Sequence, residues 1–247
     1  MTAPATGGAP DLGLFARIAG VLTAPRATFE RVVASPRPVL ILLVVAIVVG
    51  LAGAVPQFSE AGQQAILDAQ AAARESMGRP MSADEYAVME RLAPYFPYFT
   101  LGQILIFLPI FCLVIAALCW VAFNTVLGGA ATFKQVLAIV THSQVVGALG
   151  AVVAAPIQAL QGTVTAGGPF NLGVLVPMLD ESSTLARLLG ITNVFTIWWL
   201  VVMAIGFGVL YRRKSTNVAI GLIVAYGAIA YTLIAVFGSM FGGGQGR

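Results

Sequence analysis

The only histidine of the chain, His142, lies in "THSQ" at 141–144, four consecutive polar residues inside an otherwise apolar run. A buried imidazole can relay protons, bind a metal ion or hydrogen bond to a neighbouring helix. A metal site is not expected, because one histidine without a nearby carboxylate does not complete a set of metal ligands. Two interpretations stay open: a polar site that conducts a solute or ion, and a polar contact between packed helices.

Small residues at helical spacing accompany these polar residues. In lipid, helices associate through small side chains that let their backbones approach, because the surrounding acyl chains are as apolar as the helices themselves. One series lies on the run that contains His142 and another on the last apolar run. We call both together the predicted seam: Ser143, Gly147, Gly150 and Ala154, then Gly221, Ala225 and Ala228. These series favour helix packing over transport.

Polar residues on or beside the seam form the candidate intramembrane cluster. Ser143 lies on the seam, and its two neighbours flank it by about 100° each around the helix. Hydrogen bonds across helices explain such residues, although an ionisable residue within a membrane span is also a candidate functional site. The cluster comprises Thr141, His142, Ser143, Gln144, Asn124 and Asn193.

Motifs for catalysis or cofactor binding are missing from the sequence. It contains no GxSxG nucleophile elbow, no HExxH zinc motif, no phosphate-binding loop and no dinucleotide fingerprint. Cys112 and Cys119 are seven residues apart, about 10 Å along a helix, which is too far for a disulfide bond. We therefore expect no enzymatic activity, no cofactor and no metal site.

The elements that carry these residues are predicted to cross a membrane. The chain is 59% hydrophobic and only 9% charged, with a mean hydropathy of +0.92, whereas soluble domains average about 25% charged residues. Charged side chains are missing from three long stretches, 135–179, 188–211 and 215–246. Such stretches suit lipid rather than water. We therefore predict an all-α integral membrane protein whose main partner is the lipid bilayer.

Five apolar runs are long enough to cross the bilayer as helices, which takes about 20 residues each. The predicted spans are 38–55, 101–127, 134–160, 189–211 and 216–240. They form one bundle domain at 38–240. A tail at 1–37 with a short amphipathic segment precedes it, and a glycine-rich tail at 241–247 follows.

The loop at 56–100 is the one sizeable element predicted outside the membrane. Its "EAGQQAILDAQAAARESMG" is rich in helix formers, and "SADEYAVME" begins with a capping box of Ser82 and Glu85, so two short helices are expected there. In the tail, "TAPRATFERVVASP" places apolar residues on one helical face and charged residues on the other. That segment is predicted to lie on the cytoplasmic surface or to pack as an ordinary first helix.

The orientation follows from the distribution of basic residues. One side carries eight and the other five. The eight lie in the tail and in the turns at 128–134 and 211–216: Arg17, Arg26, Arg31, Arg37, Lys134, Arg212, Arg213 and Lys214. This predicts a cytoplasmic N-terminus and an extracytoplasmic C-terminus. Because the net charge of +3 arises beside apolar runs, the expected partner is the membrane surface and not nucleic acid.

Several stretches resemble the Yip (Ypt-interacting protein) domain family of five-helix membrane proteins. "LTAPRATFERVVASPRPVLILLVV" is similar to its proline and aromatic entry to the first span, and "LGGAATFKQVLAIVTHSQ" to its double-glycine turn into the third. "NVFTIWWLVVMAIGFGVLYRRKSTNVAIGLIVA" resembles the start of its fourth helix and its basic turn into the fifth. The resemblance covers about residues 15–240. Family members commonly have a proline where this chain has Val145, Val146 and Gly147, so that proline's kink is not carried over.

The resemblance implies a membrane protein without enzymatic activity. Eukaryotic members carry a long cytoplasmic tail and act in vesicle trafficking with Rab-type GTPases. The short tail here is similar to the bacterial branch, so we expect a bacterial cytoplasmic (inner) membrane and do not carry trafficking over. The expected function is to organise or bind other membrane components, either other membrane proteins or further copies of itself, through the seam. The alternative is a small-solute or ion permease that uses the cluster around His142.

Overall fold

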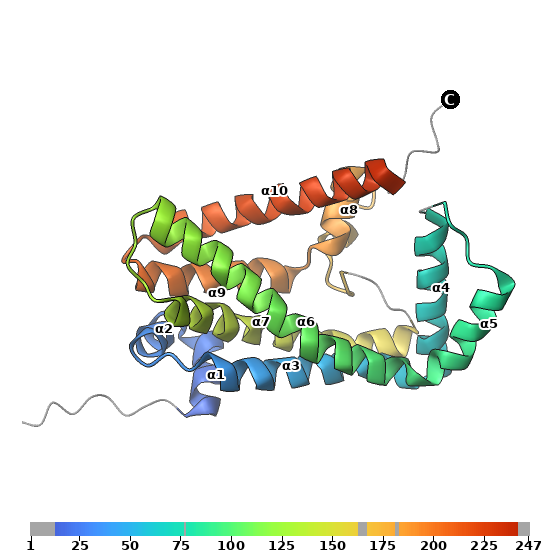
Figure 1. Ribbon diagram of the computed structural model, residues 1–247, viewed down its shortest axis with the longest axis horizontal. Coiled ribbons are helices and arrows are strands. Elements are labelled where there is room, and N and C mark those ends of the chain that lie inside the picture. The colour runs from blue at the N-terminus through green and yellow to red at the C-terminus, as the bar shows by residue number, and fades with distance from the viewer. Residues whose placement is uncertain (1–12, 77, 163–166, 181–182, 242–247) are drawn as a thin grey trace, which may run out of the picture.

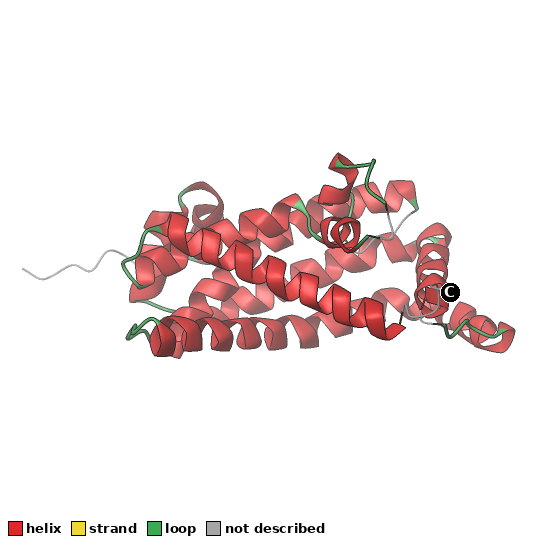
Figure 2. Cartoon of the chain, turned by 90° about the horizontal axis from the view of Figure 1, so that it is seen from above, coloured by secondary structure: helices red, strands yellow, loops and turns green. Residues whose placement is uncertain are grey.

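The computed structural model describes residues 13–76, 78–162, 167–180 and 183–241. Within these residues all regular elements are helices, apart from one isolated bridge between Asn171 and Asn193 (Figure 2). This confirms the predicted all-α class. Residues 1–12 of the predicted tail and residues 242–247 at the other end lie outside the described residues.

The bundle is built from long helices that run along the length of the molecule (Figure 1). These are α3 (Pro38–Ala54), α6 (Phe96–Trp120), α7 (Phe133–Gln161), α9 (Val194–Leu210) and α10 (Ser215–Phe241). Among the described residues, four helical stretches are long and apolar enough to cross a membrane: Pro38–Phe58, Ala83–Val126, Phe133–Gln161 and Ser215–Val236. These stretches correspond to four of the five predicted spans.

The fourth predicted span, at 189–211, differs from the structure. Residues Thr184–Ile191 form a separate helix, α8, and α9 begins only at Val194 with 17 residues. Asn193 causes the break. Its backbone is extended (φ −122°, ψ 168°), and its side-chain oxygen accepts a hydrogen bond from the Thr196 N–H at 2.9 Å. A residue in this N-cap conformation starts a new helix and cannot continue the previous one.

Helix α7 forms the centre of the bundle, because it contacts α1, α2, α3, α6 and α9. Its most apolar stretch is 67% buried, whereas that of α10 is only 11% buried. A Thr132–Gln135 capping box starts α7, and Gly162 ends it in the left-handed conformation (φ 59°) that glycine adopts without steric cost. Helix α10 is therefore an outer helix that contacts α8 and α9 on one face.

Two short helices, α1 (Leu14–Thr23) and α2 (Pro25–Ala34), lie at one end of the bundle (Figure 1). The α2 faces agree with the sequence pattern, since Phe29 and Val32 are fully buried while Arg26 and Glu30 are exposed. Helix α2 packs against α7 and α9, and Gln135 Nε2 donates a hydrogen bond to the Val33 carbonyl at 3.2 Å. The structure therefore shows the packed alternative for this segment.

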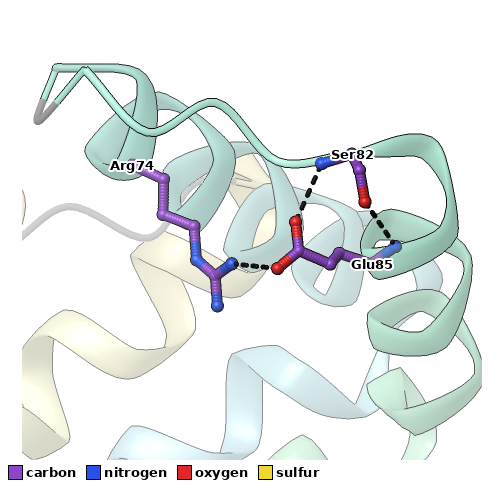
Figure 3. A network of polar contacts seen from close by, with 3 residues as sticks. All are labelled: Arg74, Ser82 and Glu85. Atoms are coloured by element: carbon purple, nitrogen blue, oxygen red, sulfur yellow. Dashed lines mark hydrogen bonds and ion pairs between the residues drawn. The ribbon is translucent and has the colours of Figure 1, made fainter.

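Two further helices, α4 (Glu60–Ser76) and α5 (Ala83–Leu92), lie at the opposite end of the bundle (Figure 1). The predicted capping box of α5 is confirmed (Figure 3). The Glu85 N–H donates to the Ser82 hydroxyl at 3.2 Å, and the Ser82 N–H donates to the Glu85 carboxylate at 2.9 Å. The Ser82 N–H holds the pKa of Glu85 below its ordinary value, and Arg74, 3.2 Å from the carboxylate, adds to this effect. This network ties α4 to α5 in the exposed loop.

Candidate functional site

The polar residues of the "THSQ" stretch are buried in the middle of the bundle, and the first three of them bond to their own helix. Thr141, His142 and Ser143 are all fully buried. The Thr141 and Ser143 hydroxyls donate to the carbonyls of Ala138 and Ile139 at 3.2 and 2.8 Å. Hydroxyl side chains in helices commonly bond back to the preceding turn in this way. These two hydroxyls therefore donate within their own helix, and hydrogen bonds from them across helices stay a prediction.

His142 is held on one side of its ring only. Its Nδ1 lies 2.7 Å from the Ala138 carbonyl, while Nε2 is buried without a hydrogen-bond partner in the described part of the chain. It is not among the residues that line a described cavity. A proton relay needs hydrogen-bonded groups at both nitrogens of the ring, and in the described chain His142 has such a group only at Nδ1.

We expect the variant His142→Asn to fold and function like the parent chain. The shorter amide can donate to the same carbonyl, and the replacement removes the unpaired Nε2, so any destabilisation should stay within about 1 kcal/mol. Thermal unfolding in mild detergent measures this. A selective loss of function at unchanged stability would instead favour the permease hypothesis.

The two asparagines of the predicted cluster lie elsewhere. Asn124 is in the π-helical turn η3 (Val121–Val126) that follows α6. Its amide donates to the Ala131 carbonyl at 2.7 Å, and its oxygen accepts from the Tyr211 hydroxyl at 2.9 Å. Asn193 caps α9, where its amide also donates to the Gly167 carbonyl at 3.3 Å. Both asparagines fix connections between helices, and the structure does not bring them together with His142.

A cavity of about 430 Å³ adjoins the "THSQ" stretch between α7, α9 and α10. Of the predicted cluster, Gln144 and Asn193 line it. The other polar side chains in its wall are Gln158, Thr196 and Tyr226. Aromatic side chains provide much of the remaining surface: Phe111, Phe170, Phe195 and Trp199. The described lining residues include no charged side chain, so the cavity is polar but uncharged.

The seam residues of α7 face two different surroundings. Gly150 is buried, and a Cβ atom placed on it would lie 2.6 Å from Cγ of Phe195 on α9. Only glycine allows this approach. Gly147, Gly150 and Ala154 all line the cavity, but a Cβ atom on Gly147 would meet only the Gln144 side chain, at 3.3 Å. Within the described chain no neighbouring helix therefore lies against Gly147, and its part in the seam stays a prediction.

The α10 half of the predicted seam does not pack within the described chain. Gly221, Ala225 and Ala228 are exposed, and a Cβ atom on Gly221 would have no neighbour within 4 Å. Contact of these residues with another helix stays a prediction.

Cys112 and Cys119 are free, buried thiols on α6.

The sequence analysis missed the cavity because the cavity depends on the connection from α7 to α9. The Gly167 backbone lies so close to Gly190 that a Cβ atom on Gly167 would overlap the Gly190 carbonyl. Two further backbone hydrogen bonds link the connection to the start of α9, Leu172 N to Thr192 O at 2.8 Å and Val194 N to Phe170 O at 3.3 Å. The paired glycines at 167–168 were the available signal for this folded connection.

No group of three or more His, Cys, Asp or Glu side chains that could hold a metal ion lies within the described ranges. The cavity instead offers amide groups, hydroxyls and an indole N–H against aromatic walls. Such a wall can bind an uncharged polar molecule by hydrogen bonding. It provides no nucleophile–base pair of the kind that catalysis requires.

Comparison with protein families gives one match, the model of the Yip1 domain, over residues 19–237. A search of curated proteins and a search of solved structures found no match. The matched region extends from α1 to the last turns of α10 and includes the α7 cluster, the cavity and the basic turn before α10. The chain therefore belongs to the Yip1 domain family of membrane proteins.

Proposed function

We propose that this protein is a non-enzymatic membrane protein that binds another membrane helix, in the first instance α10 of a second copy, through the exposed face of α10. The observation that carries the proposal is the small-residue face of α10, which no described residue covers. Gly221, Ala225 and Ala228 follow one another at spacings of four and three residues, so they lie on one side of the helix.

The exposed α10 face has the shape that a second helix needs. Large apolar side chains flank it, with Ile220 58% and Val224 64% exposed. Small residues at the centre let two backbones approach closely, and the flanking side chains then pack beside the partner helix. In lipid, this packing and not the hydrophobic effect drives association.

The proposal includes five membrane spans with the N-terminus in the cytoplasm. Helix α9 is the shortest span, about 25 Å at 1.5 Å per residue, but it packs along α7 and α10. Three segments with basic residues lie at the same end of the bundle: the tail before α3, the turn before α7 and the turn before α10. Arg213 donates to the Leu127 carbonyl at 3.1 Å, and Gln135 reaches the Val33 carbonyl. This grouping supports placing that end in the cytoplasm. Location in a bacterial cytoplasmic membrane stays a prediction.

Cysteine crosslinking tests the α10 contact. In a chain with Cys112 and Cys119 changed to alanine, Ala225→Cys should form a disulfide-linked dimer when membranes are oxidised. The matched control is Val114→Cys on α6, which is also exposed (51%) but lies outside the α10 face. Equal crosslinking at both positions, or none at residue 225, would contradict the proposed contact. Gly221→Leu in addition should abolish the crosslink without lowering the thermal stability of the monomer.

A small-solute permease is the second candidate, favoured by the uncharged cavity that Gln144 and Asn193 share. Transport requires a solute to bind there and then to pass through the bundle. If so, flux into vesicles that contain the purified protein should fall when Gln144 is changed to leucine. If flux into vesicles with the unchanged protein equals flux into empty vesicles, the permease hypothesis is contradicted and binding of another membrane helix remains the proposed function.

A further inference from the structure

A side chain in the wall of the cavity, Trp199, carries a buried hydrogen-bond donor that has no acceptor in the described chain. Trp199 lines the cavity from α9 and is only 8% exposed, and its indole Nε1 has no hydrogen-bond partner among the described residues. The indole N–H can only donate. A buried donor without an acceptor is costly, and native proteins pair nearly all such groups. This donor therefore points to a ligand that brings an acceptor oxygen.

The remaining wall restricts the charge of that ligand. Gln144 is buried in the middle of α7, Gln158 lies about four turns further along the same helix, and both line the cavity. Side-chain amides donate and accept hydrogen bonds but carry no charge. Because no charged side chain is among the described lining residues, an ionised group would enter at a large desolvation cost without a counter-charge. The ligand is uncharged.

The size of the cavity and its aromatic surface narrow the class of ligand further. About 430 Å³ lies within the range of sites for small organic molecules, about 300–1,000 Å³. Phe170 and Phe195 meet edge to face with ring centroids 5.6 Å apart and present apolar surface. The site thus combines apolar walls with a few directed polar groups, which suits a molecule that carries an ester and a hydroxyl group on a short carbon frame.

We propose that the cavity binds the uncharged glycerol-ester group of a neutral glycerolipid or of a soluble glycerol ester, with the ester carbonyl accepting the Trp199 N–H. A free glycerol hydroxyl then bonds to the amide of Gln144. The surrounding bilayer supplies molecules of this class directly. This inference does not depend on the contact proposed for α10. The residues of that contact, Gly221, Ala225 and Ala228, do not line the cavity, whereas Tyr226 of the same helix does.

Binding of radiolabelled monoolein to the purified full-length chain, in a detergent without ester groups, tests the proposal. Saturable binding is expected, and monoacetin, a soluble uncharged glycerol ester with free hydroxyls, is titrated as a competitor to separate the lipid from the soluble source. Phosphatidylglycerol, which has an anionic headgroup, should not compete. Trp199→Phe keeps the ring but removes the N–H, so the dissociation constant should rise about tenfold.

Two further variants separate loss of the site from loss of the fold. Gly147→Leu fills the cavity and should abolish binding at an unchanged melting temperature, whereas Val152→Leu, on the exposed side of α7, should bind like the parent. Competition by monoacetin as strong as that by unlabelled monoolein would assign the site to soluble esters. Unchanged affinity in both Trp199→Phe and Gly147→Leu, or no saturable binding of either ester, would overturn the proposal.

Discussion

Replacing Gly150 by leucine should cause the largest loss of folded protein among single substitutions in α7. A Cβ atom at this position would lie 2.6 Å from Cγ and 2.9 Å from Cβ of Phe195. Both atoms belong to the fixed part of a side chain on a neighbouring helix, so α7 and α9 would have to separate. Overpacking of this kind costs about 1–3 kcal/mol, and a leucine adds three more carbon atoms beyond Cβ.

The matched controls for Gly150→Leu lie on the same helix. Val152→Leu changes an exposed residue (48%) and should leave the melting temperature in mild detergent unchanged. Gly147→Leu enters the cavity, where the nearest atom to a new Cβ is the movable Gln144 Oε1, and should also be tolerated. The measurement is the yield of monodisperse protein and its thermal unfolding. If Gly150→Leu is as stable as the two controls, the close approach of α7 and α9 is wrong.

The comparison of Gly147 with Gly150 shows where sequence reasoning stops. Both belong to one series of small residues, and helical periodicity places them on the same side of α7 within about 60°. Whether that side meets a helix or a cavity depends on α9 and on the connection at 162–193, which no period in the sequence describes. Hydropathy could therefore predict that α7 is a membrane helix, but not what lies against each turn.

Local signals were the most reliable part of the sequence. The Ser82–Glu85 capping box depends on residues three apart, and the structure confirms both of its hydrogen bonds. The break at Asn193 was missed for the opposite reason. Apolar residues continue on both sides of it, so composition indicated one span at 189–211, whereas the asparagine cap and the bridge to Asn171 end α8 and begin α9.

The buried polar residues were located but not understood from the sequence. Thr141 and Ser143 bond to their own helix, so their hydroxyls need no partner helix. Trp199, which the apolar pattern of α9 presents as an ordinary core residue, instead carries the unpaired donor in the cavity. A sequence states that a side chain is polar, but only the packing of other helices determines whether its hydrogen bonds are satisfied.

The orientation in the membrane should give an all-or-none result with reporter fusions. Five spans place the termini on opposite sides, and the basic residues favour the cytoplasm for the end that carries α1, α2 and the turn at 211–214. A reporter that is active only outside the cytoplasm should therefore work when fused after Gly246 or within 62–80. It should be silent when fused at residue 10 or 215.

The turn at 211–214 is the strongest determinant of this orientation. Arg212, Arg213 and Lys214 lie between two apolar helices with no room for a longer loop, so moving them across the bilayer would expose three cations to lipid. The links from Arg213 to Leu127 and from Tyr211 to Asn124 place the turn before α7, with Lys134 beside it, on the same side. Changing all three basic residues to glutamine should weaken this preference and give measurable activity at residue 215. Activity at 215 in the unchanged chain, with silence after Gly246, would show an inverted protein if the fusion at residue 10 is also active, and would show that α9 does not cross the membrane if that fusion is silent. Silence at both 215 and Gly246 would show that α10 does not cross the membrane, and in either of the last two cases the count of five spans would be wrong.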